Sequence, residues 1–270
     1  MWLTEEYNNF WEQGILVTEK LDETNGAEVY LNEKLGNVLA LDGQLKFCEK
    51  DAPAIFEMLS HVPLCAHPTA NKVLVLGGGS GGIATELLKH EDINCIDLVD
   101  EDDSIKELSK KYFSKFSKSF ESEKVFFHEE KAFSFLQKAQ DKDYDVIILQ
   151  RGLELDDLSL AQIKRILKGD GIFVMGSKNW WIEPEEMKEQ LTTLHEKFNI
   201  LMPYRFESYS HAGFGGSILF ASNKYHPTAD IILQKSDLLD DLDYYSCDVH
   251  LASFSLPAKM RRDLYPVMKV

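Results

Sequence analysis

Hydrophobic and polar residues alternate along three short segments near the start of the chain. The segments are GILVTEKL (14–21), AEVYLNE (27–33) and NVLALDG (37–43), and glycines punctuate them. A period of two is typical of strands with one buried face, and the intervening glycine turns favour an antiparallel meander. We therefore predict a small N-terminal antiparallel β domain over residues 1–66.

The hydrophobic spacing then changes to that of a helix, and afterwards to that of a buried sheet. Residues 51–64 place Ile55, Leu59 and Val62 on one helical face. Beyond them, helix-like stretches separate the apolar runs VLVLGG (73–78), INCIDLVD (93–100), KVFFHE (124–129), YDVIILQ (144–150), GIFVMG (171–176) and GGSILFASN (215–223). Such runs are typical of strands buried on both faces, so the pattern predicts an α/β fold with a Rossmann-like doubly wound domain over residues 67–270.

The later segments of this domain carry end signals of their own. The helix within LAQIKRILKGDG (160–171) is expected to end at Gly169 and Gly171, and the amphipathic segment 183–198 to begin a helix at Pro184. The aromatic, proline-broken stretch 240–266 predicts a tail that wraps the sheet edge.

A glycine-rich turn follows the first buried run, in VLVLGGGSGG. Gly77, Gly79 and Gly82 satisfy G-x-G-x-x-G between a strand and a helix, and Asp100 ends the next strand eighteen residues later. Glycines let a ligand approach the backbone, and an acid at that distance accepts ribose hydroxyls. The motif indicates a nucleoside site, for a dinucleotide or an S-adenosyl compound. The alternative is that the glycines only permit close helix–sheet packing and Asp100 only caps a strand.

Charge and cysteine content narrow the classes of partner. The chain has 45 acidic and 29 basic residues, a formal net charge of -16, which repels nucleic acid and anionic membranes. This negative charge is compatible with a cationic substrate. The alternative explanation is that it only keeps the protein soluble. The four cysteines show no CxxC spacing, so we expect no metal site and no disulfides. With no apolar leader or membrane-length run, a cytoplasmic protein is expected.

Nearly the whole chain resembles the polyamine aminopropyltransferases, of which spermidine synthase is the commonest member. The resemblance is carried by LDGQLKFCEKDAPAIFEMLSHVPLCAHPTANKVLVLGGGSGGIATELLKH (41–90), then LVDEDD, YDVIIL, LKGDGIFV, PYRFESY, FASNKYHP and DYYSCDVHLASFSLP, in collinear order. HVPL before the glycine turn and the tail from YY to LP are its most specific parts.

The resemblance implies both a fold and a reaction. The fold is a β-stranded N-terminal domain plus a Rossmann-like domain of the S-adenosylmethionine-dependent methyltransferase type. Decarboxylated S-adenosylmethionine is the implied donor, a co-substrate with no further cofactor, and putrescine the implied acceptor. A neutral amine displaces methylthioadenosine, giving spermidine. Family members are dimers or tetramers, so the resemblance implies a homodimer or homotetramer.

The resemblance also assigns the donor site, with departures. It places donor binding on Gly77, Gly79, Ser80, Gly82, Asp100 and Glu130. Ser80 stands where the family has an aspartate facing the donor's amine. Lys131 stands where an acid meets the adenine, so Glu129 or Glu130 is expected to substitute.

The amine site departs further from the family pattern. The resemblance assigns amine binding to Asp51, Glu57 and Tyr245. The family motif DSTDP reads QRGLELDD here, so Gln150 and Leu153 replace its two aspartates. Glu154 and Asp156 are then the candidates for the catalytic base, and a solvated surface loop is the competing explanation. A non-catalytic paralogue that binds polyamine or nucleoside is the second hypothesis, and a methyltransferase, which HVPL and the tail disfavour, is the third.

Overall fold

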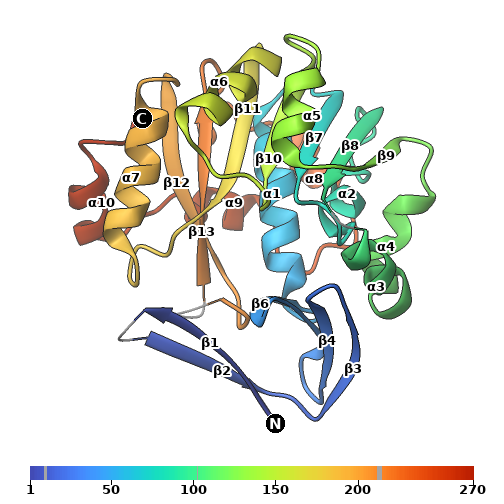
Figure 1. Ribbon diagram of the computed structural model, residues 1–270. Helices are drawn as coiled ribbons and strands as arrows, with labels where there is room; N and C mark the ends of the chain where they lie inside the picture. Colours follow the sequence, from blue (N-terminus) through green and yellow to red (C-terminus); the bar gives the residue numbers. More distant parts are fainter. Residues whose placement is uncertain (9–10, 102, 212–214) are drawn as a thin grey trace.

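The computed structural model describes residues 1–8, 11–101, 103–211 and 215–270, which form two small antiparallel sheets and one large sheet (Figure 1). The first small sheet pairs β1 (Trp2–Asn8) with β2 (Trp11–Leu16). The second is a meander of β3 (Glu19–Thr24), β4 (Ala27–Asn32), β5 (Gly36–Leu41) and β6 (Gln44–Cys48). The predicted N-terminal antiparallel region is therefore confirmed.

One predicted strand is wrong in its bounds. Residues 14–21 form the end of β2 and the start of β3, because the chain changes its pairing partner at Val17 and Thr18. The Val17 N–H donates to the Met1 carbonyl at 2.9 Å, whereas the Thr18 N–H donates to the Leu31 carbonyl at 2.8 Å. The alternation of buried and exposed residues continues through this corner because Val17 is fully buried. The hydrophobic pattern alone therefore does not show where β2 ends and β3 begins.

Helix α1 (Ala52–Ala66) connects the small sheets to the large one. A helix is confirmed here, but it is buried on every side and not only along one face. Its polar residues have partners: the Ser60 hydroxyl donates to the Ile83 carbonyl at 3.2 Å, and His61 contacts His90 and Glu86. α1 thus forms a shared core element, and the predicted domain boundary at residue 66 stays a prediction.

The large sheet has seven strands in the order β12-β13-β11-β10-β7-β8-β9. Strands β7 (Lys72–Leu76), β8 (Cys95–Asp100), β9 (Val125–Glu129), β10 (Tyr144–Leu149) and β11 (Leu167–Ser177) are parallel, and β13 (Gly215–Ser222) runs antiparallel to β11 and β12 (Ile200–Glu207). The chain winds outward from β7 to β9 and returns to β10 on the other side of β7. This reversal creates the crevice where doubly wound sheets bind ligands.

Helices cover both faces of this sheet, as the buried strand pattern requires. Val73 and Val75 of β7 join one hydrophobic cluster with α1, while Leu74 and Leu76 join the other. The covering helices are α2 (Gly82–Leu87), α3 (Ser104–Tyr112), α4 (Ser114–Ser117), α5 (Ala132–Lys138), α6 (Asp157–Ile166) and α7 (Pro184–His195). The predicted doubly wound architecture is confirmed.

The predicted end of the helix at residues 160–171 is wrong. α6 ends at Ile166, and Gly169 and Gly171 lie inside β11. Residues 168–171 bulge there, since Leu167 pairs with Tyr144 but Ile172 pairs with Val146. A side chain at Gly171 would approach Leu167 within 2.6 Å, so the bulge, and not a helix cap, requires this glycine.

The C-terminal segment 231–270, which we call the tail and which contains the predicted stretch 240–266, wraps the molecule from α1 to the edge strand β12. It forms α8 (Leu233–Asp237), α9 (Cys247–Ser253) and α10 (Ala258–Leu264). The Ile232 N–H donates to the Cys65 carbonyl of α1, and Lys269 pairs with Leu201 of the edge strand β12. Among the described residues, no helix has the length and apolar character needed to cross a bilayer.

Candidate active site

The glycine turn lies at the carboxyl end of β7, beside the reversal of strand order. Gly77 has φ +81° and Gly81 has φ +77°, a left-handed conformation that L side chains rarely adopt. A side chain at Gly79 would come within 2.6 Å of the Asp100 carboxylate. Two of the three motif glycines, together with Gly81, therefore shape a turn that follows the strand closely.

The third motif glycine is explained by packing. A Cβ atom on Gly82 would lie 2.2 Å from the ring of Phe56, which is fully buried in α1. Gly82 thus permits close contact between α1 and α2, which is the alternative that the sequence left open for these glycines. Through this contact, the glycine turn is attached to the first turns of α1.

Asp100 ends β8 and faces the glycine turn. Its Oδ2 accepts a hydrogen bond from the Gly79 N–H at 2.8 Å. The same oxygen forms an ion pair with Arg151 Nη2 at 2.5 Å. Burial raises the pKa of Asp100, and the Arg151 guanidinium offsets part of that effect. The predicted ribose acid therefore lies where a nucleoside on the turn would meet it.

Arg151 is a residue of this site that the sequence patterns did not single out. Its side chain lies over the turn: a Cβ on Gly77 would approach Arg151 Cγ within 2.3 Å. The sequence feature that could have identified Arg151 is that it is a single basic residue near several acidic ones, just after β10 at the reversal of strand order. Its guanidinium keeps the Asp100 carboxylate paired.

The two remaining donor candidates differ in their surroundings. Ser80 is buried in the turn, where its Oγ lies 3.5 Å from the Gly82 N. Glu130 reaches the same edge of the sheet because its N–H donates to the Asp100 carbonyl at 3.0 Å. Its carboxylate, however, pairs with Lys138 at 2.6 Å. A contact with adenine would require this exposed pair to open, so the role of Glu130 stays a prediction.

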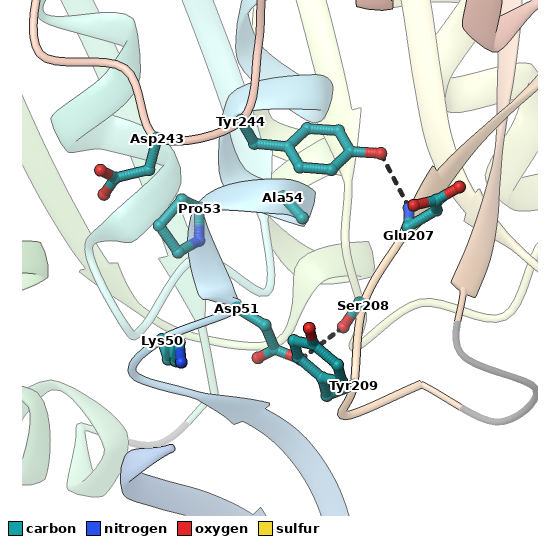
Figure 2. Close-up of a pocket in the computed structure, with 9 residues that line it drawn as sticks. All are labelled: Lys50, Asp51, Pro53, Ala54, Glu207, Ser208, Tyr209, Asp243 and Tyr244. Carbon is teal, nitrogen blue, oxygen red and sulfur yellow. Dashed lines mark hydrogen bonds between the residues drawn. The ribbon is translucent and has the colours of Figure 1, made fainter. Parts of the chain in front are cut away.

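A cavity of about 340 Å³, which we call the α1 cavity, opens at the first turn of α1 (Figure 2). The start of α1, the end of β12 and the tail together form its wall. The lining residues are Lys50, Asp51, Pro53, Ala54, Glu207, Ser208, Tyr209, Asp243 and Tyr244. Three carboxylates against the single ammonium of Lys50, together with two phenols, give it a net acidic, hydrogen-bonding lining, which suits a cationic ligand.

The three carboxylates of the α1 cavity are held differently. Asp51 Oδ2 accepts hydrogen bonds from the Ser208 hydroxyl at 2.7 Å and the Ser210 N–H at 2.6 Å. Asp243 pairs with Lys115. Among the described residues, the Glu207 carboxylate has no hydrogen-bond or ion-pair partner, and in Figure 2 Glu207 and Asp243 lie on either side of Tyr244. Glu207 is thus the most available acceptor, and the sequence patterns did not select it.

Glu57 and Tyr245 do not line this cavity. Glu57 is 1% exposed, and its carboxylate accepts the backbone N–H groups of Asp243, Tyr244 and Tyr245 at 2.9, 2.9 and 2.6 Å. Tyr245 is buried, with its hydroxyl 2.9 Å from His250 Nδ1. The amine-binding role expected of both stays a prediction: Glu57 anchors the tail, and the neighbouring Tyr244 supplies the phenol that lines the cavity.

Comparison with protein families gives a match over most of the chain. Residues 53–229 match the family described as the spermine/spermidine synthase domain. The chain belongs to this family. Its large sheet and glycine turn are therefore those of an aminopropyltransferase, and the protein is a transferase, as the resemblance implied.

Relatives and solved structures cover the chain almost from end to end. It is 32% identical over 269 residues to the polyamine aminopropyltransferase of Bacillus subtilis, covering 95% of this chain and 96% of that one. It is 34% identical to that of Shouchella clausii, covering 92% and 91%. The crystal structure of spermidine synthase from Thermotoga maritima superposes with a TM-score of 0.92 at 27% identity, covering 98% of this chain and 94% of that one. The N-terminal sheets therefore belong to the shared fold.

The loop after β10 is where this aminopropyltransferase departs most from the expected pattern. Leu153 packs against the hydrophobic cluster beneath it, and Glu154 is exposed to solvent. Asp156 is the N-cap of α6, since its Oδ1 accepts the Ser159 N–H at 2.7 Å. That hydrogen bond lowers the pKa of Asp156 and makes it a weaker base. The cap explains Asp156 better than catalysis does, and a role for Glu154 stays a prediction.

Replacing Asp156 with alanine should lower the free energy of unfolding by about 1 kcal/mol, because it removes the helix cap. Turnover should be unchanged. Urea denaturation and an activity assay of the same preparation measure both quantities, with Asp157→Ala as the matched control one residue along. A large loss of turnover at unchanged stability would restore Asp156 as the catalytic base.

Buried histidines make the stability of this aminopropyltransferase depend on pH. Burial lowers the pKa of His90 to about 3 and that of His250 to about 4, from 6.5. Neutral His250 donates Nε2–H to the Pro227 carbonyl at 2.9 Å and accepts from the Tyr245 hydroxyl, and His61 lies 2.9 Å from His90. Protonation would put a proton on His250 Nδ1, which could then no longer accept from the Tyr245 hydroxyl, and would place a charge on a buried ring at either position.

Stability should therefore be full above about pH 6.5 and fall as the pH drops toward about 4. In that window the unfolded chain binds protons that the folded protein excludes, and each such histidine contributes up to about 1.4 kcal/mol per pH unit. Urea midpoints measured across this range test the expectation. His250→Asn should flatten the dependence, and midpoints that stay constant down to pH 5 would contradict it.

Proposed function

We propose that the protein transfers the aminopropyl group of decarboxylated S-adenosylmethionine to putrescine or a similar diamine. Besides the family, one observation carries this proposal: the acid-lined α1 cavity begins at Asp51, and Phe56 of the same helix packs against the glycine turn. The proposed nucleoside site and the proposed amine site would therefore lie at adjacent turns of α1. The net charge of -16 favours two cationic substrates.

On the donor side, Asp100 is proposed to accept the ribose hydroxyls. Its carboxylate is already oriented by the Gly79 N–H, and the turn lets the nucleoside approach the backbone. Ribose binding would displace the guanidinium of Arg151 from Asp100. The sulfonium centre of the donor is itself activated, so the proposed step uses no further cofactor.

On the acceptor side, the carboxylates of the α1 cavity are proposed to orient the diamine. An alkylamine with a pKa of about 10.4 is almost entirely protonated at neutral pH, so one end must lose a proton while the other stays held. The neutral nitrogen then attacks the methylene carbon beside the sulfonium. The carbon–sulfur bond breaks, the sulfur keeps the electron pair, and methylthioadenosine leaves. Glu207 is the proposed partner of the held ammonium, and Tyr209 and Tyr244 complete the wall.

Release of methylthioadenosine from decarboxylated S-adenosylmethionine, measured with putrescine, cadaverine and spermidine in turn, tests the proposal. We expect turnover with at least one amine. Glu207→Gln should lower kcat/KM at least about 10-fold, because it removes one charge-assisted contact. Glu186→Gln, an exposed carboxylate of α7 outside the cavity, is the matched control. Nucleoside binding without turnover on any amine would contradict transfer and identify a non-catalytic relative.

A further inference from the structure

A second cavity, of about 480 Å³, lies at the same edge of the large sheet. We call it the Trp180 cavity. The loop after β11, the facing ends of β12 and β13, and helices α9 and α10 form it. Its lining residues are Asn179, Trp180, Trp181, Arg205, Phe206, Glu207, Gly215, Gly216, Ser217, Tyr244, Val249, Ala252, Ser253 and Met260. It shares only Glu207 and Tyr244 with the α1 cavity, and its volume suits a small ligand.

Two buried hydrogen-bond donors in this cavity lack acceptors. Trp180 is 95% buried, and its Nε1 has no hydrogen-bond partner among the described residues. The buried Nε of Arg205 likewise has no hydrogen-bond partner among the described residues. A buried donor without an acceptor is rare and costs stability, so a ligand that brought an acceptor to these two side chains would be stabilised there.

The charge and shape of the Trp180 cavity indicate which chemical group of a ligand would serve as the hydrogen-bond acceptor. Arg205 supplies a guanidinium, which binds planar carboxylates well. The walls beyond are apolar, formed by Phe206, Val249 and Met260. A cation such as a diamine would meet like charge at Arg205, so this cavity does not repeat the chemistry of the α1 cavity.

The spacing along β12 sets the length of the ligand. Arg205 and Glu207 are two residues apart in the strand, so both side chains leave the same face, about 7 Å apart at their Cα atoms. A molecule with a carboxylate at one end and an ammonium at the other would pair with both. We propose that the Trp180 cavity binds a short-chain carboxylate, and that an ω-amino acid of four or five carbons fits it best.

Titration calorimetry and tryptophan fluorescence, with 5-aminopentanoate, pentanoate, pentylamine and inorganic phosphate as probes, test this proposal on the full chain. We expect both carboxylates to bind and to change the tryptophan emission, with 5-aminopentanoate binding tighter. Phosphate should not bind, and pentylamine, whose ammonium suits the acid-lined α1 cavity, should leave the tryptophan emission unchanged. Absence of carboxylate binding up to about 10 mM, an affinity weaker than typical ligand sites, would overturn the proposal, as would binding of phosphate alone.

Single substitutions test whether residues that line the Trp180 cavity, and not residues outside it, determine carboxylate binding. Arg205→Gln should weaken 5-aminopentanoate binding about 10-fold or more, as expected for loss of a charged partner. Trp180→Phe, which keeps the packing but removes the indole N–H, should weaken it about 5-fold by calorimetry. Arg261→Gln, an exposed arginine on α10 outside the lining, is the control and should bind normally. Unchanged affinity in Arg205→Gln would overturn the assignment.

The proposal does not rest on the transfer reaction. Methylthioadenosine release by the unaltered protein is measured separately from carboxylate binding. Binding without any transfer activity would therefore contradict the proposed function alone, whereas transfer activity without carboxylate binding would contradict this inference alone.

Discussion

Replacing Asp100 with asparagine should weaken the binding of methylthioadenosine about 100-fold. The substitution removes the charge that is proposed to hold two ribose hydroxyls, and hydrogen bonds to charged groups contribute about 1.5–3 kcal/mol. It also leaves the Arg151 guanidinium, now paired at 2.5 Å, without its carboxylate. Titration calorimetry with methylthioadenosine measures the effect, and an unchanged affinity would show that the ribose lies elsewhere.

Arg151→Gln is the informative companion variant, because its expected effect has the opposite sign. Without the guanidinium, the nucleoside no longer competes with an internal cation for Asp100, so affinity should rise about 5-fold, as expected for a partly buried ion pair. In the Asp100→Asn background, Arg151→Gln should change nothing, since the shared partner is gone. Weaker binding in the single variant would instead show that Arg151 contacts the nucleoside.

Replacing Glu57 with alanine should lower the free energy of unfolding by about 3–5 kcal/mol. Three backbone N–H groups of the tail donate to this one buried carboxylate, and all three would lose their acceptor inside the protein. Urea denaturation followed by circular dichroism measures the loss. Glu57→Gln keeps one acceptor oxygen and should cost less.

Glu207→Gln and Glu154→Gln are the controls for the stability effect of removing a carboxylate. Both side chains are exposed, so each should change the free energy of unfolding by no more than about 0.5 kcal/mol. A Glu57→Ala protein as stable as these two would mean that solvent or another side chain satisfies the tail amides. If Glu57→Ala fails to fold, the free energy of unfolding of Glu57→Gln can still be compared with those of Glu207→Gln and Glu154→Gln, and it should be the lowest of the three.

The architecture could be predicted from the sequence because its core strands are buried on both faces. Val73 to Leu76 are apolar at every position, and each side of the strand enters a different cluster. The elements that were missed lack such a signal. β6 alternates weakly, as QLKFC, and the corner at Val17 continues the alternation through a change of partner. The partner of a strand is set by residues far away in the sequence, and local periodicity carries no information about them.

The candidate site was predictable only where the backbone defines it. The left-handed Gly77 and the strand-end position of Asp100 follow from motif spacing, and the structure places both at the strand reversal. Which of two adjacent tyrosines faces a cavity depends on how Glu57 holds the tail, which spacing does not reveal. Arg151 was missed because its partner, Asp100, is 51 residues away in the sequence.

The attachment of the tail to α1 has a consequence for how this enzyme could change its acceptor. Tyr244 is the shared wall of the two cavities, yet it belongs to a segment outside the Rossmann-like sheet. A residue change at that position would alter the length of the space open to a substrate while leaving the strands and the glycine turn intact. The proposed acceptor wall and the strands of the large sheet thus lie in separate parts of the chain, joined at Glu57.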